Sequence, residues 1–119
     1  MSNLMDEGHL APSDEELISD ALRGNKGAFS ELVRRYEKKV YSLAYSILLN
    51  RDDAMDVSQD AFLKAYEGLR GYRGGSQFFT WLYRIVVNLC IDFTRKEKAK
   101  GEIEYIDAID PGQLHTSLT

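Results

Sequence analysis

The sequence predicts an all-α fold, a compact bundle of three to four helices. Apolar residues recur at spacings of three and four along most of the chain, and strict alternation of apolar and polar residues is almost absent. The length agrees with one small domain: 119 residues, of which 44% are hydrophobic and 29% charged, suit a single core flanked by tails.

The first two predicted helices lie on either side of a glycine hinge. Ser13 and Glu16 have the spacing of a capping box, which opens a short helix that ends near Gly24. After Gly24 and Gly27, a second helix is expected over about 28–49, with the strongest periodic signal in the chain. Its inward stripe is Phe29, Leu32, Val33, Tyr36, Val40, Leu43, Ala44, Ile47 and Leu48.

Two further helices follow on either side of a loop that contains three glycines. The third is expected over about 52–69, and the fourth from 76 or 77 to about 98. The third buries Ala54, Val57, Ala61, Phe62, Ala65 and Leu69; the fourth buries Phe78, Leu82, Ile85, Val86, Leu89 and Phe93. Beyond Gly101 the sequence shows no stable helical period.

The expected domain organisation is therefore one folded unit with two tails. Residues 1–12 are predicted to be a disordered N-terminal tail, residues 13–100 the helical domain, and residues 101–119 an acidic linker. Neither a secretory signal nor an apolar segment of membrane length is present, so we expect a cytoplasmic protein without membrane insertion.

The net charge of −4 conceals a strong segregation of charge along the chain. Residues 71–100 contain six basic and two acidic side chains, whereas residues 101–119 contain no basic and four acidic side chains. Charge blocks are usually solvated faces, so this pattern alone leaves nucleic-acid binding open.

Catalytic chemistry is not expected. Cys90 is the only cysteine, which excludes an internal disulfide and a multi-cysteine zinc site. Both histidines, His9 and His115, fall in the predicted tails, and no nucleophile motif is present. We therefore predict neither an enzyme nor a cofactor, metal or small-molecule substrate.

An acidic row is predicted on the third helix. At about 100° per residue, Asp53, Asp56 and Asp60 share one line opposite the apolar stripe. A solvated face is the simplest interpretation. A metal-dependent hydrolase would need carboxylates that converge in a pocket, so docking of a basic protein partner is the better functional hypothesis.

A polar face is predicted on the fourth helix. Arg84, Asn88 and Arg95 cluster away from the core, with Val87 and Ile91 beside them as exposed apolar residues. Arginine pairs with phosphates, and asparagine offers a donor and an acceptor to the edge of a base. This face is a candidate contact surface for nucleic acid.

The loop that precedes this helix adds an aromatic ring. Its three glycines permit positive φ and close approach of another chain, and Tyr72 is a ring able to stack on a base. By helical phase, Phe78 and Trp81 belong to the core or its edge. Tyr72 is therefore predicted to be free, and Phe79 is a second candidate.

Two long strings carry a resemblance to a known family. "FSELVRRYEKKVYSLAYSILLNRDDAMDVSQDAFLKAY" and "LRGYRGGSQFFTWLYRIVVNLCIDFTRK" together resemble region two, the core promoter-recognition domain, of bacterial sigma factors of the extracytoplasmic-function group. The resemblance covers about residues 26–98 and implies the same helical fold.

The resemblance also implies two binding surfaces and their partners. The helix with the "DAMDVSQD" string would dock on the clamp helices of the largest RNA polymerase subunit through Asp53, Asp56, Gln59 and Asp60. The loop over 71–77 and the next helix would hold a base flipped from the non-template strand of the promoter minus-ten element. The implied DNA-binding residues are Tyr72, Arg73, Gly74, Ser76, Arg84, Asn88, Arg95 and Lys96.

The resemblance carries further expectations. Lys98 and Lys100, with Lys96, would add nonspecific attraction to phosphates. An anti-sigma factor is an expected partner, and Val87 and Ile91 could serve that contact. Met55 stands where the family often has an acidic residue. The family normally has a second domain, a helix-turn-helix, and nothing after Gly101 resembles it. This chain is therefore predicted to be a fragment. The alternative function is a helical protein-interaction module without DNA binding.

Overall fold

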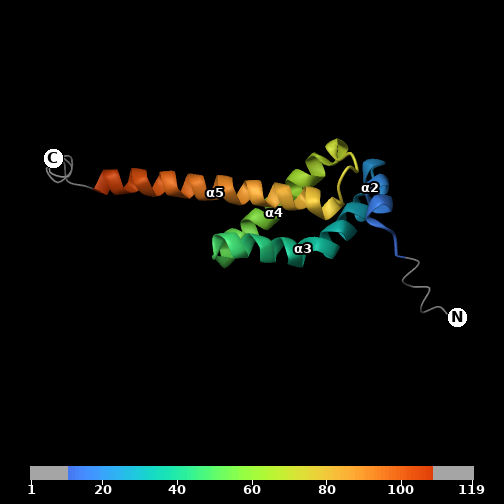
Figure 1. Cartoon of the computed structure of the whole chain (residues 1–119), viewed down its shortest axis with the longest axis horizontal. Coiled ribbons are helices and arrows are strands. Elements are labelled where there is room, and N and C mark those ends of the chain that lie inside the picture. The colour runs from blue at the N-terminus through green and yellow to red at the C-terminus, as the bar shows by residue number, and fades with distance from the viewer. Residues whose placement is uncertain (1–10, 109–119) are drawn as a thin grey trace.

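The structure, a computed structural model, describes residues 11–108, and all regular secondary structure within this range is helical (Figure 1). The elements are α2 (Asp14–Leu22), α3 (Lys26–Leu48), α4 (Arg51–Glu67), the short 3₁₀ helix η1 (Leu69–Gly71) and α5 (Phe78–Ala108). This confirms the predicted all-α bundle. His9, His115 and most of both predicted tails lie outside the described residues.

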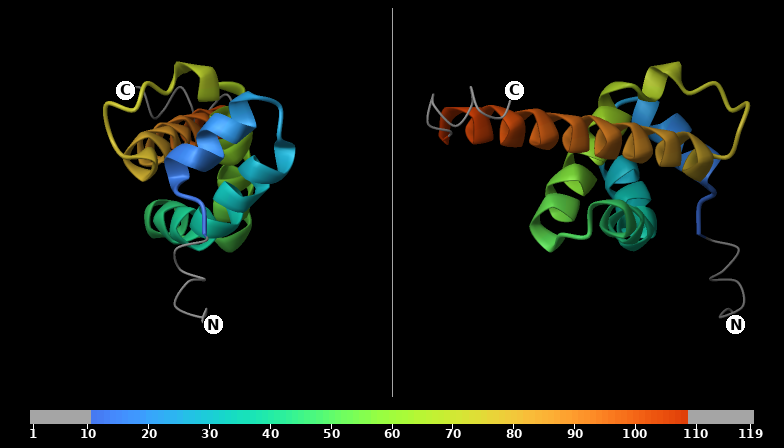
Figure 2. Two further views of the ribbon diagram at one scale, coloured as in Figure 1. Left: turned by 90° about the vertical axis from the view of Figure 1, so that its right-hand side faces the viewer. Right: turned by 60° about the vertical axis from the view of Figure 1, so that its left-hand side comes forward.

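α3, α4 and α5 pack against one another, and α2 lies across one end of this group, near the starts of α3 and α5 (Figures 1 and 2). At the other end, the second half of α5 extends beyond the bundle (Figure 1). One cluster of buried side chains fills the centre: Leu17, Ile18, Ala28, Phe29, Leu32, Val40, Ala44, Ala54, Val57, Ala61, Ala65, Leu69, Phe78, Leu82, Val86 and Cys90.

Side-chain caps explain where the helices begin. The Glu16 N–H donates to Ser13 Oγ at 3.1 Å and the Ser13 N–H donates to Glu16 Oε1 at 2.8 Å, which confirms the capping box of α2. The amide oxygens of Asn25 and Asn50 accept hydrogen bonds in the first turns of α3 and α4. Gly24 directly follows Arg23, the C-cap residue of α2, and has a φ of 101°, a conformation that favours glycine.

Several predicted boundaries and burials are wrong. Because Asn25 supplies the cap, α3 begins at Lys26 and its first turn includes Gly27, which was predicted to be part of a hinge. Leu69 is buried but belongs to η1, because α4 ends at Glu67. Ile47 is 40% exposed, because it lies at the end of α3 on the edge of the predicted stripe.

The largest correction concerns the end of α5. This helix was predicted to end near residue 98, but it continues through Gly101 to Ala108. A single glycine costs a helix only about 1 kcal/mol relative to alanine, so it does not have to end one. Part of the predicted linker is therefore helical, and residues 109–119 lie outside the described range.

Candidate functional site

The acidic face of α4 is formed as predicted, opposite the buried side of the helix. Asp56, Gln59 and Asp60 are exposed and Asp53 is half-buried, while Ala54, Val57, Ala61 and Ala65 on the other side are packed into the core. Among residues 11–108, no ion pair engages any of the three aspartates. Their negative charge is therefore available to a partner.

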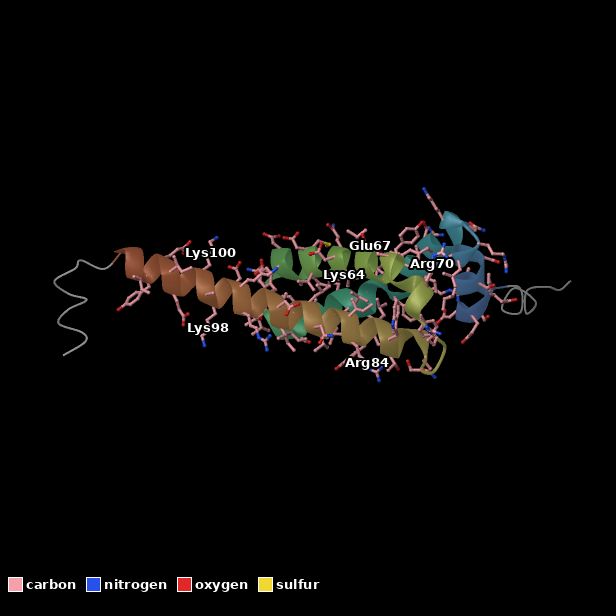
Figure 3. All side chains as sticks on the ribbon, turned by 90° about the horizontal axis from the view of Figure 1, so that it is seen from above. Lys64, Glu67, Arg70, Arg84, Lys98 and Lys100 are labelled. Carbon is pink, nitrogen blue, oxygen red and sulfur yellow. The ribbon has the colours of Figure 1, made fainter. Side chains whose placement is uncertain are left out.

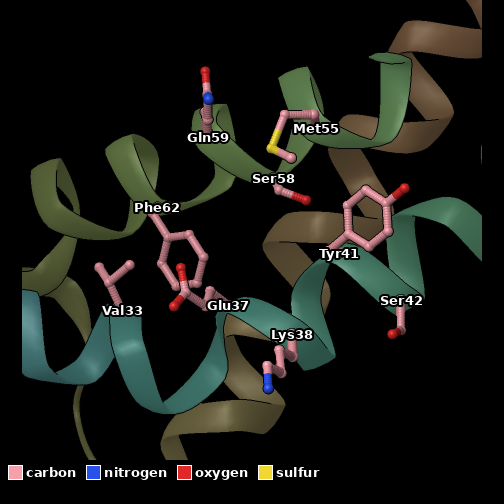
Figure 4. Close-up of a pocket in the computed structure, with 9 residues that line it drawn as sticks. All are labelled: Val33, Glu37, Lys38, Tyr41, Ser42, Met55, Ser58, Gln59 and Phe62. Atoms are coloured by element: carbon pink, nitrogen blue, oxygen red, sulfur yellow. The ribbon is translucent and has the colours of Figure 1, made fainter. Parts of the chain in front are cut away.

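A groove that the sequence did not reveal runs beside this face, between α3 and α4 (Figure 4). It has a volume of about 690 Å³ and is lined by Val33, Glu37, Lys38, Tyr41, Ser42, Met55, Ser58, Gln59 and Phe62. Phe62 points from α4 toward α3, whereas Gln59 points away from it. The residue in the sequence that could have indicated this groove is Met55, an apolar side chain that lies between Asp53 and Asp56. Met55 is exposed and lines the groove.

The metal-dependent alternative gains no support from this geometry. In the part of the chain that the structure describes, no group of three or more histidine, cysteine, aspartate or glutamate side chains could hold a metal ion. Asp53, Asp56 and Asp60 follow one another along the side of α4 opposite its buried residues.

The prediction that Tyr72 is a free ring is wrong. The ring is half-buried; it packs edge-on against Phe78, with centroids 5.9 Å apart, and at a tilt of 53° against Trp81, with centroids 5.3 Å apart. Its hydroxyl donates to the Ser76 carbonyl oxygen at 2.5 Å, which ties the two ends of the loop together. Burial, followed by the charges of Glu15 and Asp14, raises the pKa of Tyr72, so its hydroxyl stays protonated and able to donate.

The loop itself leaves room for another chain. A Cβ added at Gly71, Gly74 or Gly75 would meet nothing within 4 Å, so the backbone is open on that side. Of these three glycines, only Gly74 has a positive φ, of 76°. Arg73 is exposed, and Ser76 is half-buried with its carbonyl oxygen already bonded to Tyr72.

Phe79 was the second candidate for a free aromatic ring, and that prediction is also wrong. Its ring is half-buried and stacks on Tyr36 of α3, with centroids 5.5 Å apart and planes inclined by 17°. The sequence could not show this packing, because Tyr36 is distant in the chain. Trp81 packs against the core cluster, as predicted.

The outer face of α5 presents the predicted polar residues to solvent. Arg84, Asn88, Arg95 and Lys96 are all exposed, and Figure 3 shows Arg84 pointing away from the bundle. On the part of α5 that extends beyond the bundle, Lys98 points to the same side of the helix as Arg84, whereas Lys100 points to the opposite side (Figure 3). Of the two apolar residues predicted to be exposed here, Ile91 is 41% exposed, whereas Val87 is half-buried.

α2 contributes an element that the sequence did not connect to the site. Asp14 forms an ion pair with Arg35 at 3.1 Å and accepts a hydrogen bond from the Tyr36 hydroxyl. Arg35 also donates to the Pro12 carbonyl oxygen at 2.6 Å. Burial and the hydrogen bond to Asp14 raise the pKa of Tyr36 to about 12. These contacts fix the start of α2 against α3. A hollow of about 310 Å³ between these elements and the start of α5 is lined by Asp14, Glu15, Tyr36, Gln77, Phe78 and Phe79.

Comparison with known families agrees with this geometry. The family described as Sigma-70 region 2 matches residues 32–100, which include α4, the loop and the outer face of α5. The helical bundle is therefore a sigma-factor region 2 domain.

Named relatives define the group more closely. The chain is 44% identical over 75 residues to the RNA polymerase sigma-H factor of Pseudomonas aeruginosa, covering 63% of this chain and 39% of that protein. It is 40% identical over 98 residues to the ECF RNA polymerase sigma-E factor of Escherichia coli, covering 82% and 51%. The chain belongs to the extracytoplasmic-function (ECF) sigma factors of the sigma-70 family, and it spans about half the length of these relatives.

Two solved structures have the same fold. An engineered region 2 of sigmaE in complex with GTAAAA matches with a TM-score of 0.70 and 36% identity, covering 75% of this chain and 93% of that one. CnrH in complex with the cytosolic domain of CnrY matches with a TM-score of 0.62 and 30% identity, covering 83% and 68%. No helix within residues 11–108 is long and apolar enough to cross a membrane.

Proposed function

We propose that this chain directs RNA polymerase to promoters for transcription initiation. The acidic face of α4 docks on the clamp helices of the largest polymerase subunit. The loop over 71–77 and the outer face of α5 recognise the minus-ten element by capturing a base flipped from the non-template strand.

The observation that carries the DNA-binding part is the exposed face of Arg84, Asn88 and Arg95 on α5. This face belongs to a domain similar to an engineered region 2 of sigmaE that was solved with GTAAAA. An arginine pairs with a phosphate or a guanine edge, and Asn88 offers both a donor and an acceptor to one base. Arg73, Gly74, Ser76 and Lys96 contribute at the loop and along the helix.

The energetics make this function dependent on polymerase. Extruding a base costs a few kcal/mol, and stacking of a captured base returns about 1 to 3 kcal/mol. The two nearly cancel, and a chain with net charge −4 has little general attraction for DNA. The polymerase that holds the domain at the promoter therefore supplies the local concentration that strand opening needs.

The polymerase-binding part rests on unpaired carboxylates. Asp56 and Asp60 are exposed and Asp53 is half-buried. Within residues 11–108 none of the three takes part in an ion pair. Gln59, which lines the groove, lies between Asp56 and Asp60 in the sequence. A convex row of free carboxylates suits a basic partner, because complementary charge steers association and fixes its register.

An anti-sigma factor is the expected regulator, as the family resemblance implies. Support comes from the similar protein CnrH, which was solved in complex with the cytosolic domain of CnrY. In the inactive state the anti-sigma factor would cover the polymerase-binding and DNA-binding surfaces of this chain. We expect this complex to form in the cytoplasm.

A charge-reversal pull-down tests the polymerase contact. The double variant Asp53→Lys with Asp56→Lys is expected to lose most of its binding to polymerase core while it remains helical, because both side chains point away from the core. Asp52→Lys is the matched control, since Asp52 is exposed on the same turn but outside the row. Unchanged binding of the double variant would refute the assignment.

A second assay separates this function from a protein-interaction module without DNA binding. Single-stranded oligonucleotides with minus-ten-like sequences are expected to bind better than scrambled ones, and Asn88→Ala is expected to remove the difference. Equal binding of both sequences at low salt would favour the alternative module.

A further inference from the structure

We propose that the chain has a second contact for single-stranded DNA, formed by Lys39 of α3 with Phe79 and Tyr83 of α5. We call this the α3–α5 aromatic surface. The inference rests on the proposed function and extends it: this surface would hold nucleotides next to the captured base, without reading their sequence.

Three aromatic rings are arranged as a continuous packed row. Phe79 stacks on Tyr36 with centroids 5.5 Å apart, and Tyr83 contacts Phe79 edge-on at 6.3 Å. Tyr36 and Phe79 are half-buried, and packing of the bundle accounts for both. Tyr83 is 45% exposed and does not belong to the core cluster, so packing does not account for it.

A lysine stands over this row. The Lys39 Nζ atom lies 5.5 Å from the centroid of Phe79 and 6.0 Å from that of Tyr36. Lys39 is exposed and takes part in none of the ion pairs found within residues 11–108. The aromatic faces hold the ammonium group in place without neutralising its charge.

This combination has the chemistry of a single-strand binding surface. Exposed aromatic rings stack on bases of any sequence, and an unpaired cation beside them attracts the backbone phosphates. A partner protein could also use a lysine and a tyrosine, but the position of the surface favours nucleic acid.

That position is beside the proposed base-binding face. Tyr83 immediately precedes Arg84, so the two side chains leave the helix about 100° apart on the same turn. Phe79 lies in the first turn of α5, directly after the loop. We expect a strand with one base at the loop to pass the start of α5, and the aromatic surface flanks this path on the α3 side.

The roles of the two surfaces are expected to differ. Asn88 would select a base, because it can form hydrogen bonds with a base edge. Lys39 and Tyr83 would contribute affinity that is independent of sequence, because stacking and phosphate attraction do not distinguish bases.

Fluorescence anisotropy with the full chain and labelled single strands tests the inference. Tyr83→Ala is expected to weaken binding by about 5- to 100-fold for minus-ten-like and scrambled oligonucleotides alike. Tyr83→Phe keeps the ring and is expected to bind within about twofold of the unchanged chain. Lys39→Gln is expected to reduce the slope of log affinity against log salt by about 0.7.

Two variants serve as matched controls. Tyr45 is 40% exposed and stacks on Tyr41, as Tyr83 contacts Phe79, but it lies at the far end of α3, so Tyr45→Ala is expected to leave DNA binding unchanged. Lys64 is an exposed lysine on α4, and Lys64→Gln is expected to leave the salt slope unchanged. Circular dichroism melting of every variant identifies any loss of fold.

The outcomes separate this inference from the function on which it rests. If Asn88→Ala abolishes sequence preference while Tyr83→Ala and Lys39→Gln bind like the unchanged chain, the proposed function holds and the aromatic surface is refuted. The inference is also refuted if these two variants lose polymerase binding but retain DNA binding, because the surface would then be a protein contact. Absence of any sequence preference in the unchanged chain would instead count against the proposed function.

Discussion

The hydroxyl of Tyr72 provides a sharp test of how the loop works. Tyr72→Phe keeps the ring against Phe78 and Trp81 but removes the hydrogen bond to the Ser76 carbonyl oxygen. Such a bond contributes about 0.5 to 1.5 kcal/mol. This corresponds to about a 2- to 12-fold change in the equilibrium between the closed and the open loop. Because Tyr72 is half-buried, we expect the lower part of this range.

The expected result is a loss of affinity for a single-stranded minus-ten oligonucleotide that does not exceed this factor, since apparent affinity falls in proportion to the fraction of chains whose loop is in the binding-competent state. Anisotropy titrations of the unchanged chain, Tyr72→Phe and Tyr72→Ala at one salt concentration measure it. Equal binding by the unchanged chain and Tyr72→Phe, with loss only in Tyr72→Ala, would refute the reasoning, because the ring rather than the hydroxyl would then matter.

Three further predictions concern the fold. Leu82 is fully buried, so Leu82→Ala is expected to lower the free energy of unfolding by about 2 to 5 kcal/mol in denaturant melts; a loss below about 1 kcal/mol would contradict its central position. Folding raises the pKa of the Tyr36 hydroxyl from 10.0 to about 12. The contribution of this hydroxyl to the free energy of unfolding is therefore complete below pH 10 and is lost as the pH rises from 10 to about 12. Over that range the chain is expected to lose more stability than Tyr36→Phe, and equal losses would contradict the raised pKa of Tyr36. Cys90 is fully buried and burial raises the pKa of its thiol, so Ellman's reagent is expected to react slowly in buffer and rapidly in denaturant, and fast reaction in buffer would contradict the burial.

The helices themselves could be predicted because their signals are local. A capping box at Ser13 and apolar residues at helical spacing depend only on neighbours within a few positions, and the structure confirms both. The exposed positions of Asp56, Asp60, Arg84 and Asn88 follow from the same arithmetic.

The aromatic residues could not be assigned correctly, because their partners come from other parts of the chain. Phe79 is held by Tyr36 of α3, and no periodicity within α5 reveals that contact. Tyr72 was predicted to be free because it lies in a glycine-rich loop, yet the loop folds back so that its hydroxyl reaches Ser76. The end of α5 could not be predicted for a different reason: α5 continues through Gly101, because one glycine weakens a helix by only about 1 kcal/mol.

Selection from a pool of random single-stranded oligonucleotides tests the central claim, recognition of a promoter strand through a captured base, most directly. The chain is expected to enrich a short motif in which one position is nearly invariant, and Asn88→Ala is expected to make that position variable while the domain stays folded. Recovery of no motif by the unchanged chain at low salt would contradict the claim.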